Sequence, residues 1–586
     1  MNQLDKNSLI FLAVLFVALM AAAEAQAQET QPTPERHRYQ IDLKIDFDHL
    51  SFTGRERVRW INRGDKPTSV IYFHLYPNIR TAETETVSNS SSEPDEPTLS
   101  VTEVRSVQGD TPLYFFLDDQ ATTLRVNLRE PVAPLTATEV LIKFKGIVPE
   151  IDPDETSLTT HVVKQVSAAL RSERETRRAR DLNFRCKGVM LLATSYPVLA
   201  VHDGDDWHRK LEPSVGDIIF NEVADYEVTV TTNAGVEVFT PGTESTDAKA
   251  NGSTTFTASA LRDFAILAGR GLRSEQLEAE GVTLRSIYLV EHERVGKRAL
   301  TVAANSLRVF TSIFGPLPFK NINIAETPLV AGLGSTELSA FNIIASAFYV
   351  DFDAPAVRNL PEIIREQRPS VEESLEWTVA HLIAHQWWGA AVGNDPAREP
   401  ILDEALSCWS SIVYYRKTYG EERAKTVLDD QVKGVYRLYR TFGGDDMDAN
   451  RPSRDYRNTF QYAAIVTAKG ALMFLELQRA LGDEKTFAAL RNYYKSNVYE
   501  IAQLEDLRSA LVAEAPIEQR RMIGRTFTRW LTSKRGDEDI APPDVELAAS
   551  LGVPSKQAPA RSGDKNAFTA LAKVGKFFWQ QMTRIR

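Results

Sequence analysis

Cysteine is scarce in this chain of 586 residues, which contains only Cys186 and Cys408. A scaffold held by several disulfides is therefore excluded, and a chain of this length can bury substantial apolar cores instead. Export from the cytoplasm would permit one disulfide between the two thiols. The favoured interpretation is a buried free thiol, and the sequence leaves the state of both cysteines open.

Basic residues are fewer than acidic ones, 68 against 79, which gives a formal net charge of −11. Arginines cluster between Lys164 and Arg180, but glutamates are mixed with them. A nucleic-acid partner requires a concentrated basic surface, so we expect no nucleic-acid partner.

The chain has few extended apolar runs, and the one at the amino terminus covers Ser8 to Ala23. This run has fewer residues than a helix needs to span a membrane. Lys6 precedes the run, and two A-x-A processing sequences follow it within residues 23–27. No cysteine follows the run, which argues against a lipid anchor. We expect residues 1–27 to be a signal peptide and the mature protein to be extracytoplasmic, either periplasmic or secreted. The alternative is an uncleaved anchor.

Glutamate is absent from the place where a zincin metal site needs it. His381 and His385 are spaced so that both side chains project from one face of a helix, where together they can bind one Zn²⁺. The residue after the first histidine normally supplies the general base that deprotonates the metal-bound water. In this chain that residue is Leu382, which cannot accept a proton.

Glu404 opens a second expected helix, residues 404–419, downstream of the two histidines. Its carboxylate would complete a shell of two histidines and one glutamate, with the fourth zinc position left open. Cys408 lies one helical turn further on, and an alternative in which it occupies that fourth position stays open. The sequence therefore predicts a zinc site made by His381, His385 and Glu404.

These motifs resemble those of a known family. The H-x-x-x-H pattern, followed by Gln386-Trp-Trp-Gly389 and then by Asp403-Glu404-Ala405, is similar to the gluzincin aminopeptidases, the family of aminopeptidase N and leukotriene hydrolase. Upstream, the run from Gly334 to Glu337 and Leu338 resembles the family's G-x-M-E-N strand. The resemblance implies that Gly334 and Glu337 bind the free amino terminus of a peptide. A solvated strand carboxylate is the alternative for Glu337.

A second catalytic group of this family is missing. The stretch Ala468-Lys-Gly470 resembles the family helix that begins Y-E-K-G, whose tyrosine hydrogen-bonds the oxyanion. Thr467 stands at the matching position, and Tyr462, five residues earlier, is an open substitute. A general base typically contributes ~10²–10⁴ in rate, and one oxyanion donor contributes ~10²–10³. The resemblance therefore confirms no catalytic residue.

The strand and helix patterns predict an α+β multidomain fold. Residues 36–272 contain period-two runs separated by turn residues, which indicates a β-sandwich and resembles the family's amino-terminal saddle domain. Residues 274–535 are mixed and then mostly helical, as in a thermolysin-like metallopeptidase domain. A linker is expected at 536–564 and a basic amphipathic helix at 565–586. That helix either lies on an anionic membrane surface or packs back onto the protein.

Two hypotheses follow for the function. In the first, the protein is a zinc-binding member of the family that is catalytically impaired, or a pseudoenzyme, and binds peptide amino termini. In the second, it is an active zinc aminopeptidase that has recruited another general base, such as Glu337. Leu382 and Thr467 favour the first hypothesis, and the retained ligand set keeps the second open. Whether the protein is an enzyme is uncertain from the sequence alone.

Overall fold

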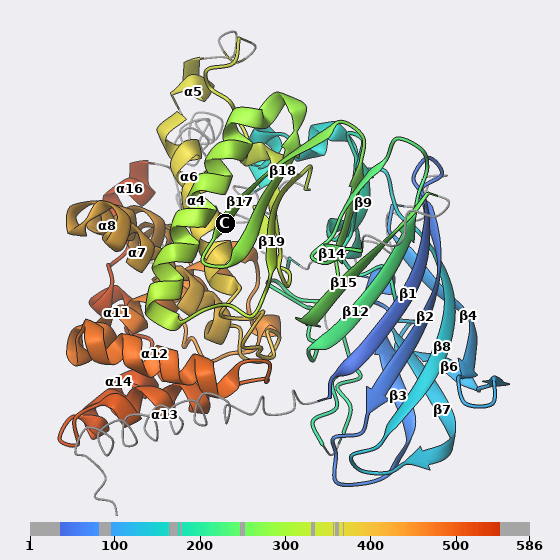
Figure 1. The fold of residues 1–586 in the computed structure, drawn as a ribbon. Coiled ribbons are helices and arrows are strands. Elements are labelled where there is room, and N and C mark those ends of the chain that lie inside the picture. Colours follow the sequence, from blue (N-terminus) through green and yellow to red (C-terminus); the bar gives the residue numbers. More distant parts are fainter. Residues whose placement is uncertain are drawn as a thin grey trace, which may run out of the picture.

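The structure is a computed structural model, and it describes residues 35–550 apart from 81–94, 162, 165–173, 176–177, 205, 212, 246–251, 330–333, 356, 358–361 and 367. The predicted signal peptide and the predicted basic helix lie outside the described residues. A β-rich part and a largely helical part lie side by side, with a small mixed sheet between them (Figure 1). This arrangement confirms the predicted fold class.

An eight-stranded sheet forms the main layer of the β-rich part, in the order β14-β15-β12-β1-β2-β8-β4-β5. Alternate residues of β1 are buried, because successive side chains of a strand point to opposite faces. The strands are β1 (His37–Asp46), β2 (Ser51–Ile61), β4 (Thr98–Ser106), β5 (Thr111–Pro112), β8 (Ala137–Ile147), β12 (Ala224–Thr231), β14 (Thr243–Glu244) and β15 (Ser253–Leu261).

Two four-stranded sheets complete the β-rich part, in the orders β11-β3-β7-β6 and β13-β16-β10-β9. Their buried side chains share one continuous hydrophobic core with those of the large sheet. The strands are β3 (Thr68–His74), β6 (Phe115–Asp118), β7 (Thr123–Val132), β11 (Val198–Leu199), β9 (Asn183–Cys186), β10 (Val189–Leu192), β13 (Glu237–Phe239) and β16 (Ile266–Gly269).

A five-stranded mixed sheet begins the part of the chain that the sequence predicted to be a metallopeptidase-like domain, hereafter the metallopeptidase-like part; its strand order is β17-β18-β19-β21-β20. Strands β18, β19 and β21 run parallel, and β17 and β20 are antiparallel edge strands. Helix α4 (Glu293–Phe314) connects β18 to β19 and packs on this sheet and on α6. The strands are β17 (Leu272–Ala279), β18 (Val282–Leu289), β19 (Asn321–Thr327), β20 (Ser335–Thr336) and β21 (Phe341–Ala345).

Helices α6 (Arg368–His385) and α7 (Ile401–Tyr419) pack against each other behind this sheet. Most of α6 is buried because apolar residues occupy all of its faces near its carboxyl end. The remaining helices are α5 (Glu362–Arg365), α8 (Glu421–Val427), α9 (Gly434–Thr441), α10 (Thr459–Tyr462), α11 (Gly470–Leu481), α12 (Asp483–Asn497), α13 (Leu504–Glu514), α14 (Arg520–Thr532), α15 (Gly536–Asp539) and α16 (Val545–Ser550), with π-helical turns η7 (Leu428–Lys433) and η9 (Ala463–Lys469).

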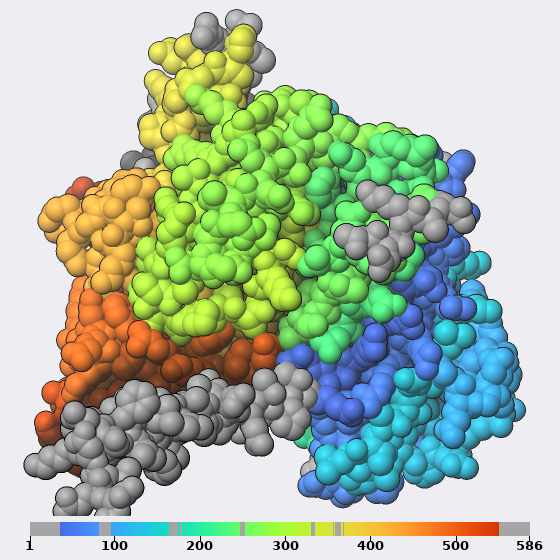
Figure 2. Space-filling model, in the orientation of Figure 1, coloured from blue at the N-terminus to red at the C-terminus, as the bar shows by residue number. Residues whose placement is uncertain are grey.

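Short helices occupy part of the segment that was predicted to be a linker. Asp537 on α15 forms an ion pair with Arg440 at 2.6 Å, which holds the segment against α9. The backbone N–H of Asp544, just before α16, donates a hydrogen bond to Oγ1 of Thr441 on α9 at 2.9 Å, so the chain stays on the body of the protein up to α16. Figure 2 shows the orange and red surface of the carboxyl-terminal part directly against the green surface of the part before it. None of the helices in the described ranges is both long and apolar enough to cross a membrane.

Candidate metal centre

Two histidines and one glutamate converge between α6 and α7. The Nε2 atoms of His381 and His385 are 2.9 Å apart, and both side chains are buried. Oε2 of Glu404, in the first turn of α7, lies 3.5 Å from Nε2 of His381 and 4.0 Å from Nε2 of His385. Within the described part of the chain, this is the group of ligand-type side chains close enough to hold one metal ion. Cys408 is not a member of it.

This donor set fits Zn²⁺. Ligand atoms about 2.0–2.2 Å from a tetrahedral Zn²⁺ lie about 3.3 Å from one another, and the three observed separations bracket that value. Nδ1 of His385 is 3.1 Å from the carbonyl oxygen of Trp388, to which it donates a hydrogen bond. That hydrogen bond leaves Nε2 of His385 unprotonated and aimed at the site, as a metal ligand requires.

Leu382, at the position of the general base, is 1% exposed and belongs to the hydrophobic core. It follows His381 directly on α6, so the backbone places it where the family carries its glutamate. A hydrocarbon side chain cannot take a proton from water. The structure thus brings the ligand residues together without the base that accompanies them in H-E-x-x-H sites.

Glu337 follows edge strand β20 and is half-buried. It lines a cavity of about 50 Å³, hereafter the inner cavity, together with His385 of the metal centre. Gly334, also predicted to bind substrate, is buried and lies before β20. A side chain at Gly334 would approach the ring of Phe348 to 3.1 Å, so the glycine permits close packing there.

Three further acidic residues line the inner cavity with Glu337, and the sequence predicted no role for any of them. They are Asp217 and Asp263, from the β-rich part, and Asp403, from the first turn of α7. Burial raises the pKa of Asp403 well above its usual range, and the charges of Glu404, Glu337 and Asp217 raise it further. The run Gly216-Asp217, similar to the family's amino-terminal domain, was the available signal for Asp217.

Tyr462 lies beside this acidic group, whereas Thr467 is half-buried in the π-helical turn η9. A Cβ atom on Gly216 would be 2.7 Å from the Tyr462 ring and 2.8 Å from its hydroxyl oxygen, so the ring packs directly on this glycine. Burial raises the pKa of Tyr462 well above its usual range, and Glu404, Asp403 and Glu337 add to the effect. Its hydroxyl group therefore keeps its proton and can serve as a hydrogen-bond donor.

Comparisons with known proteins agree with this geometry. Residues 363–530 match the family model described as the Peptidase family M1 domain. Aminopeptidase M1-B from Oryza sativa subsp. japonica is 26% identical over 242 residues, which are 40% of this chain and 26% of the relative. Aminopeptidase M1 from Arabidopsis thaliana is 27% identical over 246 residues, which are 41% of this chain and 26% of the relative. The matched region thus spans about a quarter of these relatives.

Solved structures share the fold over a much larger part of the chain. The M1 zinc metallopeptidase from Deinococcus radiodurans superimposes with a TM-score of 0.55 at 16% identity, covering 85% of this chain and 94% of that chain. The fold and the converging ligand residues define a metallopeptidase-like protein. Within that class, the M1 domain match confirms the resemblance to the gluzincin aminopeptidases. The named zinc enzymes support zinc as the metal that suits this donor set.

Proposed function

We propose that this M1 metallopeptidase-like protein binds zinc and the free amino terminus of peptides, and that it hydrolyses peptides very poorly or not at all. The observation that carries the proposal is Leu382 beside an assembled ligand group of His381, His385 and Glu404. When bound to these residues, Zn²⁺ would supply a Lewis acid for a carbonyl oxygen. In the described structure, Leu382 leaves no base at the position that serves the family.

Peptide amino termini suit the inner cavity because it is lined by the carboxyl groups of Asp217, Glu337 and Asp403. A protonated amine forms charge-assisted hydrogen bonds with such groups. A mutant of the Deinococcus radiodurans metallopeptidase has been solved with a Tyr-ser-ala substrate, which supports peptide binding by this fold. Glu337 would bind the amine, and Asp217 would add negative charge from the β-rich part.

An active aminopeptidase is the second candidate, and Tyr462 is the observation that favours it. Its protonated hydroxyl lies near the acidic group and could donate a hydrogen bond to an oxyanion in place of Thr467. This candidate still needs a recruited base, and Glu337, which lines the inner cavity together with His385, is the carboxylate that we assign to it. A base typically contributes ~10²–10⁴ in rate, so the first candidate is preferred.

Peptide binding is tested by comparing a peptide that has a free amino terminus with its acetylated form by titration calorimetry. Acetylation removes the ammonium charge, and we expect it to weaken binding about tenfold or more. Glu337→Gln should remove most of that difference, while Glu130→Gln, at an exposed position on the β-rich part, should preserve it. Equal affinities for the two peptides in the unmodified protein would contradict the proposal.

The compartment belongs to the same proposal. We propose that residues 1–27 direct export and that the mature chain works outside the cytoplasm, with residues 565–586 available for an anionic membrane surface. Both segments lie outside the described residues. Fractionation of cells that express the full chain should find the mature protein outside the cytoplasm, and recovery of unprocessed protein from the cytoplasm would contradict this.

A further inference from the structure

A second and much larger cavity lies between the β-rich part and the metallopeptidase-like part. It measures about 930 Å³ and is hereafter the outer cavity. One wall comes from β3, the β6–β7 turn and residues 207–211, 218 and 220, and the other from residues 395, 397, 398, 452 and 454. This volume is in the range of cavities that hold small ligands.

The same two chain segments form part of the wall of both cavities, with neighbouring residues facing different cavities. Asp217 and Ile219 line the inner cavity, whereas the neighbouring Ile218 and Phe220 line the outer cavity. Asn394 and Pro396 line the inner cavity, whereas Asp395, Ala397 and Arg398 line the outer one. The outer cavity is therefore a separate compartment that backs onto the wall of the amine-binding site.

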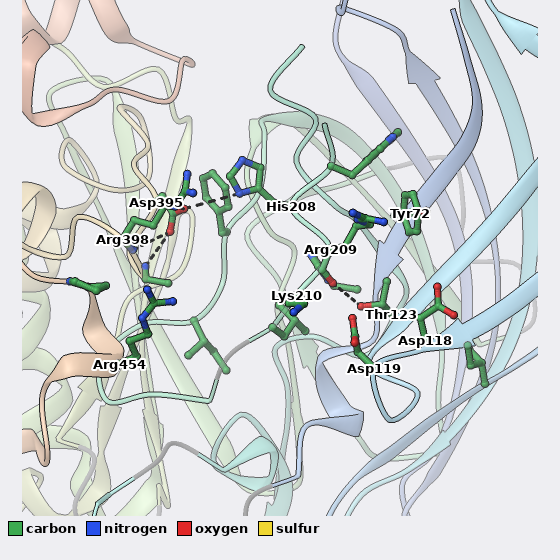
Figure 3. Close-up of a pocket in the computed structure, with 18 residues that line it drawn as sticks. Tyr72, Asp118, Asp119, Thr123, His208, Arg209, Lys210, Asp395, Arg398 and Arg454 are labelled. Carbon is green, nitrogen blue, oxygen red and sulfur yellow. Dashed lines mark hydrogen bonds and ion pairs between the residues drawn. The ribbon is translucent and has the colours of Figure 1, made fainter. Parts of the chain in front are cut away.

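Cationic side chains are concentrated in the outer cavity, although the whole chain has a net charge of −11. Figure 3 shows Lys210 between Arg454 and Arg398 on one side and Arg209 on the other. Lys210 forms no ion pair with any described residue, and Arg398 has only a 3.9 Å contact with Asp395 and a side chain that is 72% exposed. The charged groups of Lys210 and Arg398 therefore have N–H donors that can bind a ligand.

Acidic side chains in the same cavity are largely engaged. Asp395 faces both His208, at 4.0 Å, and Arg398, and Asp118 faces Arg125, at 3.9 Å. Asp119 lies on the β-rich wall with Asp118, away from Arg398 and Arg454 (Figure 3). Lys210 and the exposed end of Arg398 thus supply the positive charge that a ligand can meet.

Apolar and aromatic groups complete the outer cavity and argue against a bare inorganic anion as its occupant. Trp207, Phe220 and Ile218 line it together with Tyr72, over which the guanidinium of Arg209 stacks at 5.5 Å. A ligand that fills such a space carries an anionic group on an apolar body. A peptide with a free terminal carboxylate and a large apolar side chain has this chemistry.

We propose that the outer cavity is a second binding site that takes the carboxylate end of a peptide. Lys210 and Arg398 bind the carboxylate by charge-assisted hydrogen bonds, and the aromatic residues cover the adjoining apolar side chain. The site is independent of the proposed amine site, because Glu337 does not line it. Both sites can therefore be occupied at the same time.

The test uses the full chain and an acetylated peptide, acetyl-Leu-Phe, as the free carboxylate and as the carboxamide. Acetylation blocks the amine, so binding does not depend on Glu337. We expect saturable binding of the carboxylate form, about tenfold or more weaker binding of the carboxamide, and a similar loss in Lys210→Gln/Arg398→Gln. Lys44→Gln/Arg437→Gln, which removes two exposed positive charges elsewhere, should bind like the unmodified protein, and so should Glu337→Gln.

Three results would overturn the inference. The first is equal affinity for the carboxylate and the carboxamide, which includes no binding of either. The second is full retention of binding in Lys210→Gln/Arg398→Gln. The third is displacement by inorganic phosphate at the concentration at which the peptide binds, because it would show that the apolar body contributes nothing. Loss of binding in Glu337→Gln alone would place the peptide in the inner cavity instead.

Discussion

Gln386 connects the end of the histidine helix to the segment that carries Glu337. Its side-chain amide donates hydrogen bonds to the carbonyl oxygen of Leu338, at 3.2 Å, and to Oδ1 of Asn342, at 2.9 Å. Its Oε1 accepts a hydrogen bond from the backbone N–H of Ala340 at 2.8 Å. Every polar side-chain atom of this fully buried residue thus holds the segment that follows Glu337 against the end of the histidine helix.

Replacing Gln386 should destabilise the protein and loosen the amine site. In Gln386→Leu, the backbone N–H of Ala340 loses its buried partner, at about 1–3 kcal/mol for an unsatisfied group. The carbonyl oxygen of Leu338 keeps the hydrogen bond from the backbone N–H of Phe341. Urea unfolding should show that loss, and calorimetry should show a smaller preference for free over acetylated peptide amino termini. Gln276→Leu, on the exposed face of β17, is the control and should change neither. A Gln386→Leu protein of unchanged stability would contradict this role.

Zinc binding should depend on the assembled side chains. The purified chain is expected to retain about one zinc per molecule after dialysis, and His385→Ala to retain close to none, because two of three ligands bind too weakly. The variant His49→Ala removes an exposed histidine of the β-rich part and should leave the zinc content unchanged. Undiminished zinc in His385→Ala by elemental analysis would place the metal elsewhere.

Gly216 makes room for Tyr462, and this can be tested with a double-mutant cycle. Gly216 has a φ of +82°, so Gly216→Ala should cost about 1–2 kcal/mol for the backbone and roughly 1–3 kcal/mol more for the displaced ring. In a Tyr462→Leu background, only the backbone cost should remain. Gly281→Ala measures that cost alone, because Gly281 has a φ of +77° and nothing within 4 Å. Additive effects in urea unfolding would contradict the contact.

Asp263 should make the stability depend on pH. Burial raises its pKa from 3.8 to about 7, against the hydrogen bonds from Ser339 that lower it. Because the folded pKa lies above the unfolded one, its contribution to stability is complete below about pH 4 and is lost as the pH rises to about 7. Asp263→Asn should therefore gain stability relative to the unmodified protein over that range, while the exposed Asp65→Asn should not. Urea unfolding measures this, and a difference in the free energy of unfolding between Asp263→Asn and the unmodified protein that stays constant from pH 4 to pH 8 would contradict the prediction.

The features that the sequence predicted correctly are encoded locally. The period-two runs within residues 36–272 predicted the β-rich part, because burial of alternate side chains leaves a direct trace in the sequence. The i, i+4 spacing of His381 and His385 likewise placed both on one helical face. Helix α7 begins at Ile401, and so it contains Glu404 as expected.

The features that the sequence did not predict depend on contacts between distant segments. Asp217 reaches the inner cavity from the β-rich part, and the ring of Tyr462 packs on Gly216, although these segments are far apart along the chain. Local patterns carry no information on such packing. The ion pair between Arg440 and Asp537 similarly holds a segment that composition alone had marked as a linker.

Restoring both missing groups should raise activity more than restoring either one. Catalytic groups act as a unit, so Leu382→Glu with Thr467→Tyr should exceed both single variants in the hydrolysis of aminoacyl amides. Leu382 is buried, so the glutamate variant should also be less stable, and each variant should be assayed below its unfolding transition. A single change that matches the double variant would show that the other group is not limiting.

The central claim is that the assembled metal centre lacks effective hydrolysis, and the turnover of aminoacyl fluorogenic substrates by the unmodified, zinc-loaded protein tests it most directly. With Leu382 at the base position, proton transfer from water is unassisted, so the rate should stay near background and should not change when a chelator is added. Turnover at ordinary enzyme rates of ~1–10³ s⁻¹, abolished by the chelator and by His385→Ala, would contradict the account and establish an active aminopeptidase with a recruited base.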